Sequence, residues 1–304
     1  DFKSFCNAVV NGIAEYLLQY EIESIRLETV CHNNGVEHVG LVILLQGDYV
    51  SPTIYLEQYY QYMVRQQASL SDVLELVAKE YRRVEDCLQK QEPLTVDLDQ
   101  MQSRVFLRLV NYERNQETLA NCPYIPFHDL AIIFRCVFHK GENGMASSTV
   151  SEDDLKRWHT DTKTLYQLAE RNTPRYFPPV IDRITAYLKA RNCLPAFVED
   201  EFSGECGELY VISNEMGLNG AGAMLYRGIL DMCTELAGDS IYIMPSSIHE
   251  CMFVEAGKVS EPKMLADIVK EANDSVLHRQ DILSYNVYYY AVSYTHLRAH
   301  ETLS

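Results

Sequence analysis

Hydrophobic residues recur at helical spacing at the start of the chain and alternate as in β-strands directly afterwards. The first pattern, Phe2, Phe5, Val9, Ile13 and Leu17, predicts an amphipathic helix. Residues 25–32 and 36–45 are rich in β-forming side chains and are joined by Asn33-Asn34-Gly35. An Asn-Gly pair between two such runs favours a hairpin, because the tight turn needs positive φ at both central residues. A short extended segment, residues 53–56, follows.

A second helical pattern begins after Ser69, whose hydroxyl can cap the helix. Polar residues 89–93 follow this helix and predict a domain boundary, with an N-terminal lobe at 1–92 and a C-terminal domain at 93–291. The inner face of the helix is predicted to hold Leu70, Val73, Leu74, Val77, Tyr81, Val84 and Leu88.

The C-terminal domain begins with strand-like residues 104–110. A nearly unbroken apolar run at 129–138 predicts a central strand. Helices are predicted after the cap Ser151, at 161–172 ending before Pro174, from Pro178 and Pro179 onward, and at 263–273, with a last strand at 287–290.

The central stretch of this domain predicts a βαβ unit. Residues 209–212 and 240–244 have strand composition, and the residues from Ala221 to a stop at Gly238 have helical spacing. Strands joined by a crossover helix are expected to be parallel neighbours. Residues 248–255 then predict an antiparallel strand, so the fold class is α+β with two lobes. The inward helix face is predicted to hold Met224, Leu225, Ile229, Met232, Cys233 and Leu236.

Glycines between the first strand and this helix suggest a ligand site. Residues 217–222 precede a predicted helix start, where free N–H groups favour an anion such as phosphate. The spacing G-x-x-G-x-G fits neither the dinucleotide fingerprint nor the P-loop, and no Lys follows. The alternative is a turn whose small residues allow close packing. The ligand-binding candidates are Asn214, Asn219, Gly220 and Gly222.

A second candidate site lies where the chain enters the strand at 248–255. Ser246, Ser247, His249 and Glu250 have the residue types of a hydrolase, although no G-x-S-x-G motif surrounds them. The alternative is a turn whose hydroxyls cap backbone groups. The second His of H-E-x-x-H is replaced by Phe253, so no metal site and no cofactor are predicted.

The charge of the chain narrows the classes of partner. A formal net charge of −17 disfavours binding to nucleic acid or to an anionic membrane. The longest apolar runs are far too short for a membrane span. The nine cysteines form no C-x-x-C pair, which favours reduced thiols in a cytoplasmic protein.

The last residues are excluded from these predictions. The sequence VSYTHLRAHET at 292–302 resembles a translated sequencing adapter, so residues 292–304 are interpreted as a non-native tail. His296, His300 and Glu301 therefore receive no metal assignment.

Several phrases resemble a bacterial family of unknown function, domain-of-unknown-function family 5688. The resemblance covers nearly the whole chain from Phe2 to Tyr290 and implies one shared architecture without implying an activity. The matching phrases are NNGVEHVGLVI, SPTIYLEQYY, DLAIIF, LKRW, RNTPR, NGAGAMLY, IYIMPSSIHE, LADIVKEAN and ILSYNVYYY.

No complete catalytic set is visible, so the sequence favours a non-enzymatic binding or regulatory protein with a protein or small-molecule partner. Two alternatives remain open: a phosphate- or nucleotide-binding protein that uses the Gly217–Gly222 loop, and a hydrolase that uses Ser247 and His249. The oligomeric state stays open.

Overall fold

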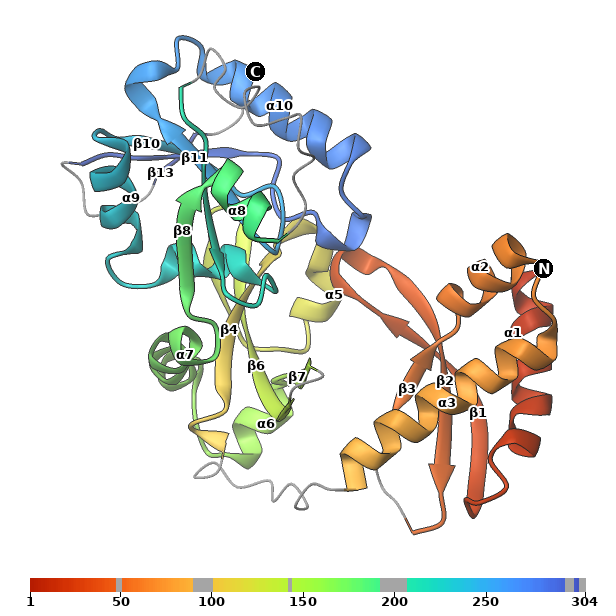
Figure 1. Ribbon diagram of the computed structural model, residues 1–304. Helices are drawn as coiled ribbons and strands as arrows, with labels where there is room; N and C mark the ends of the chain where they lie inside the picture. Colours follow the sequence, from red (N-terminus) through yellow and green to blue (C-terminus); the bar gives the residue numbers. More distant parts are fainter. Residues whose placement is uncertain (48–50, 90–100, 142–143, 192–206, 293–297, 301–304) are drawn as a thin grey trace. The chain divides into compact units, whose positions relative to one another are not determined.

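The computed structural model describes residues 1–47, 51–89, 101–141, 144–191, 207–292 and 298–300. The chain divides into two compact units, Asp1–Leu94 and Thr95–Ser304. Both units contain helices and antiparallel strands (Figure 1), which confirms the predicted α+β class. The predicted boundary at residues 92 and 93 and most of the predicted tail lie outside the described residues.

The N-terminal unit packs helices against a three-stranded antiparallel sheet with the order β1-β2-β3. Its core brings together Val9, Ile43 and Val77, one from the first helix, one from the middle strand and one from the last helix. The elements are α1 (Phe2–Gly12), β1 (Ile22–Cys31), β2 (Glu37–Leu45), β3 (Thr53–Tyr55), α2 (Glu57–Gln66) and α3 (Leu70–Gln89).

The predicted hairpin is confirmed. β1 and β2 pair from Ile22↔Leu45 to Cys31↔Glu37, and Asn34 (φ 60°) and Gly35 (φ 65°) occupy the left-handed region that the turn requires. The sequence did not predict α2, whose N-cap is Leu56 without a side-chain cap. Without a capping residue, the sequence does not show where such a helix begins.

The C-terminal unit contains two sheets. In the first sheet the apolar strand β6 is central, as predicted, since it pairs with β4, β5 and β7. Short helices α5 and α6 and the longer α7 accompany this sheet. The bounds are β4 (Val105–Asn111), α5 (Gln116–Leu119), β5 (Tyr124–Phe127), β6 (Leu130–Gly141), β7 (Gly144–Thr149), α6 (Glu152–Arg157) and α7 (Thr162–Tyr176).

The second sheet has six strands in the order β13-β12-β10-β11-β9-β8, and every neighbouring pair is antiparallel. Leu107 and Phe134 of the first sheet share one hydrophobic core with Ile243 and Phe253 of the second. The bounds are β8 (Pro179–Arg183), α8 (Ile184–Ala190), β9 (Tyr210–Asn214), α9 (Ile229–Ala237), β10 (Ile241–Met244), β11 (Cys251–Glu255), α10 (Pro262–Ser275), β12 (Val287–Tyr290) and β13 (Arg298–His300).

The predicted pairing of the two central strands was wrong. β9 and β10 run in the same direction, but β11 lies between them and pairs antiparallel with both. The turn after β10 returns the chain into the sheet beside β9. The pairs β9–β11 and β11–β10 therefore both form antiparallel ladders. Among the described strands the sheet contains no parallel pair.

The helix that joins these strands is also shorter than predicted. Residues Gly220–Leu225 form a separate 3₁₀ helix, η4, and α9 begins only at Ile229. Met232 and Leu236 were expected to face inward, yet they are 55% and 49% exposed. Gly228 (φ 81°) interrupts the helix between η4 and α9. Residues before and after it therefore do not share one continuous helical face, and the spacing across Gly228 predicts the inward residues wrongly. The predicted stop at Gly238 (φ 84°) is confirmed.

Two proline positions were misread. Pro179 opens strand β8 rather than a helix, and Pro174 lies inside α7, which continues to Tyr176. The last turn of α7 is fixed to β4, because Thr173 Oγ1 accepts a 3.0 Å bond from the backbone N–H of Leu107. These tertiary bonds outweigh the local preference to end a helix before proline.

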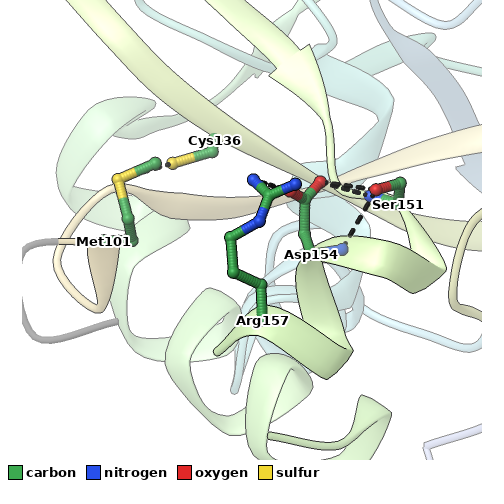
Figure 2. Close-up of polar contacts among 5 residues, drawn as sticks. All are labelled: Met101, Cys136, Ser151, Asp154 and Arg157. Carbon is green, nitrogen blue, oxygen red and sulfur yellow. Dashed lines mark hydrogen bonds and ion pairs between the residues drawn. The ribbon is translucent and has the colours of Figure 1, made fainter. Parts of the chain in front are cut away.

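Ser151 caps α6 as predicted. Its hydroxyl accepts from the backbone N–H of Asp154 at 3.1 Å, and the Asp154 carboxylate accepts from the backbone N–H and hydroxyl of Ser151 (Figure 2). On the nearby strand β6, the Cys136 thiol lies 3.8 Å from the sulfur of Met101. Burial raises the pKa of Cys136 to about 12, so the thiol stays protonated and packs as an apolar group.

No helix within the described ranges has both the length and the apolar character to cross a membrane.

We expect Ser151→Ala to lower the free energy of unfolding by about 1 kcal/mol, because it leaves the first N–H groups of α6 without their side-chain acceptor. Urea unfolding followed by circular dichroism measures this loss. Ser148→Ala, on the exposed side of β7, is the matched control and should change the midpoint little. Equal midpoints for the two variants would contradict the role of the cap.

Candidate functional site

The candidate residues gather at the end of β9, in the loop after it and in the turn between β10 and β11. β9 ends at Asn214, which has no exposed surface. The side chain of Asn214 closes the loop: its Nδ2 donates to the carbonyl of Leu218 at 2.8 Å, and its Oδ1 accepts from the N–H of Leu218 at 3.4 Å. The loop is therefore held at both of its ends by one amide side chain.

Arg191, just after α8, supports the same loop from outside. Its Nη2 donates to the carbonyl of Asn214 at 2.9 Å. The guanidinium carbon lies 3.8 Å from the centre of the Tyr187 ring, within the range of a cation–π contact. The Tyr187 hydroxyl in turn donates to Ser213 Oγ at 3.0 Å. Helix α8 thereby fixes both strand β9 and the loop.

Gly220 is needed for close packing. A Cβ at this position would lie 2.2 Å from the carbonyl oxygen of His249 and 2.4 Å from Ser213 Oγ, distances that no side chain tolerates. A Cβ at Gly222 would lie 3.3 Å from the Leu107 side chain, which can move slightly. The glycine pattern therefore reflects the approach of η4 to β9 and to the turn before β11.

Five backbone N–H groups of the loop, those of Gly217, Leu218, Asn219, Ala221 and Gly222, bond to the protein itself. Gly217 donates to Asn214, Asn219 donates to His249 Nδ1 at 3.4 Å, and Ala221 donates to the carbonyl of Ile248. Leu218 and Gly222 also donate to loop acceptors. A phosphate cradle needs such donors directed outward. The geometry of Asn214, Asn219, Gly220 and Gly222 therefore supports the close-packing alternative.

His249 lies half-buried at the centre of this cluster. Its Nδ1 accepts the bond from Asn219, so the ring proton belongs on Nε2, which lies 3.4 Å from Oδ1 of Asp281. Its backbone is also held, since the carbonyl accepts from Ser213 Oγ at 2.9 Å. We call Ser213, Asn214, Asn219, His249 and Asp281 the polar junction.

The two serines serve the backbone of the turn. Ser247 is 1% exposed, and its hydroxyl accepts from the backbone N–H of His249 at 3.0 Å. Ser246 is buried, and its carbonyl accepts from the N–H of Leu283. Within the described residues, the imidazole bonds to neither serine hydroxyl and not to Glu250. The imidazole of His249 therefore contacts the carboxylate of Asp281, and neither Ser246 nor Ser247 offers it a hydroxyl as nucleophile.

Sequence reasoning missed Asp281. This residue lies in a short 3₁₀ turn, Arg279–Asp281, and reaches His249 only because Ser247 pairs with Ile282 in an isolated bridge. No local motif marks such a partner. The neighbouring carboxylate in the sequence, Glu250, was the natural candidate, but a residue adjacent to His249 points away from it in an extended chain.

No group of three or more metal-binding side chains could hold an ion in the part of the chain that the structure describes. Cys6, Cys122, Cys136, Cys233 and Cys251 are buried free thiols, and Cys31 is an exposed free thiol. Burial raises the pKa of Cys233 to about 12, as it does for Cys136. These thiols remain protonated near neutral pH and are poor nucleophiles.

Comparison with known families gives one match. A family model described as "Family of unknown function (DUF5688)" matches residues 2–292. No curated protein and no solved structure matches the chain.

Substitution of the two glycines should have graded effects. We expect Gly220→Ala to lower the free energy of unfolding by about 3 kcal/mol or more, because its Cβ would meet a backbone oxygen that cannot move alone. Gly222→Ala should cost about 1 kcal/mol, since Leu107 can shift. Thermal and urea unfolding of both variants measure the difference. Equal losses, or none at Gly220, would contradict the packing role.

Proposed function

The chain belongs to the DUF5688 family of unknown function, and we propose that it acts by binding a protein partner through the tip of the β9–η4 loop rather than by catalysis. The tip consists of Glu215, Met216, Gly217 and Leu218. The observation that carries this proposal is that Met216 and Leu218 are 36% and 45% exposed although the loop is internally bonded.

The rigidity of the loop supports a binding role. Asn214 and Arg191 hold the tip in one conformation. A surface that is ordered before association loses little conformational entropy when a partner binds.

The composition of the tip fits a protein surface. Methionine is enriched at the centres of interfaces, where its flexible thioether adapts to the partner. Glu215 is exposed beside it, and Arg191 lies beneath Gly217 with Nε 3.4 Å from the position of a Cβ. These groups would form a polar rim around an apolar centre, the usual arrangement of an interface.

The chemistry of the polar junction supports the non-catalytic half of the proposal. A hydrolase needs a nucleophile within hydrogen-bond reach of its base. His249 instead contacts a backbone N–H and a carboxylate, and Ser247 is bonded to the backbone. The same bonds use the loop N–H groups that a nucleotide would require. We also propose that the protein acts in the reducing environment of the cytoplasm, and the free thiols support this location.

We expect the double change Met216→Asp and Leu218→Asp to abolish partner binding while the fold is retained. Affinity purification from the native host, followed by quantitative mass spectrometry, should recover a specific partner with the unchanged protein. Recovery should fall at least about tenfold with the double variant, because charges would replace the apolar centre of the interface. Circular dichroism checks that the fold is intact.

The matched control combines Ile268→Asp on α10 with Val276→Asp at the residue that follows α10; the two side chains are 44% and 76% exposed. This control should retain the partner. Equal recovery from both double variants would contradict the proposal. Hydrolytic turnover by the purified protein that disappears in His249→Ala would also contradict it, since the junction would then be catalytic.

A further inference from the structure

A second feature lies on the first sheet of the C-terminal unit, apart from the loop tip. Arg108 is in the middle of β4, between Leu107 and Leu109, which belong to the shared hydrophobic core. Because side chains alternate along a strand, Arg108 points to the opposite face of the sheet. On that face its directly paired neighbour is the buried Ile133 of β6.

A second arginine occupies the same face. Arg135 of β6 pairs with Phe106, which precedes Arg108 by two residues on β4. Arg108 and Arg135 are therefore diagonal neighbours on one face of an antiparallel pair, where residues lie about 7–8 Å apart. Buried apolar side chains on both sides, among them Phe106, Val110 and Val137, reduce solvent screening between the two charges.

The two arginines differ in their partners. Arg135 is anchored to β7: its Nε donates to Ser147 Oγ at 3.1 Å, its Nη1 to Thr149 Oγ1 at 3.1 Å, and its Nη2 to the carbonyl of Ser147 at 2.6 Å. Arg108 Nε is sealed from solvent without a hydrogen-bond partner, and its guanidinium forms no ion pair with any described residue.

The electrostatics of Arg108 follow from this placement. Burial, and then the positive charge of Arg135, lower the pKa of Arg108 to about 10, while the charge of Asp281 acts in the opposite direction. The side chain stays charged near neutral pH. The carboxylate of Asp281 lies 3.4 Å from Nε2 of His249 and forms no ion pair with Arg108. Arg108 is only partly buried, but its sealed Nε is a donor without an acceptor, which costs free energy unless an acceptor reaches it.

We propose that Arg108, assisted by the anchored Arg135, binds a small free oxyanion, a carboxylate or a phosphate, on this face of the sheet. The planar fork of an arginine matches both kinds of anion and forms two parallel charge-assisted hydrogen bonds with either. In a chain with a net charge of −17, the general field repels anions, so binding depends on this local pair.

The test uses the full chain and a thermal shift at constant ionic strength, with sodium chloride replaced stepwise by sodium phosphate in one series and by sodium acetate in another. We expect at least one anion to raise the Tm saturably, by roughly 2–5 °C, because binding stabilises only the folded state. The series that responds identifies the class of anion.

Arg108→Met separates this site from general salt effects. The variant removes the uncompensated charge and keeps an unbranched side chain, so its Tm without added anion should rise by roughly 2 °C or more. Its saturable response to phosphate and acetate should be lost. Arg227→Met, at an exposed arginine, should behave like the unchanged protein, and circular dichroism confirms that each variant is folded.

Three results would overturn the proposal. The first is a flat response of the unchanged protein to both anions. The second is an equal response in Arg108→Met, which would place binding elsewhere. The third is a lower Tm of Arg108→Met without added anion, which would mean that a carboxylate of the protein itself already neutralises Arg108.

Discussion

The contact between Gly220 and the turn before β11 is the constraint on which the C-terminal unit depends. No side chain fits between the Gly220 Cα, the carbonyl of His249 and the hydroxyl of Ser213. This approach lets Ala221 bond to Ile248 and lets Asn219 bond to the imidazole. One close backbone contact thus joins strand β9, helix η4 and the β10–β11 turn, and it aligns the six-stranded sheet with the core that it shares with the first sheet.

The same contact explains the chemistry of the candidate site. Hydroxyl, amide and imidazole groups that resemble catalytic residues in the sequence are used to fix buried backbone. Buried polar groups must be bonded, because each unpaired group costs free energy comparable to a lost hydrogen bond. A polar junction of this kind fixes the loop, and the apolar tip that follows it is the surface that we propose for partner binding.

Arg108 is one of the described residues with a buried polar atom that has no hydrogen-bond partner, as are Trp158 and Asn273. Where the polar junction pairs its donors with acceptors, the guanidinium of Arg108 faces an aliphatic side chain across the strand pair and a second positive charge diagonally. The two features therefore differ: the donors of the junction bond within the protein, whereas Nε of Arg108 has no acceptor among the described residues. Arg108 lies on β4 of the first sheet and the loop tip follows β9 of the second, while the charge of Asp281 in the junction acts on Arg108.

The sequence by itself determined the elements whose signals are local. The Asn34-Gly35 turn, the caps at Ser69 and Ser151, the stop at Gly238 and the central strand β6 were all predicted from neighbouring residues. Only the tertiary structure decided the insertion of β11 between β9 and β10, the extension of α7 past Pro174 and the pairing of His249 with Asp281. These features depend on contacts between residues far apart in the chain. Periodicity and capping residues report local structure only, so they do not show which distant segment gives the pairing of lowest free energy.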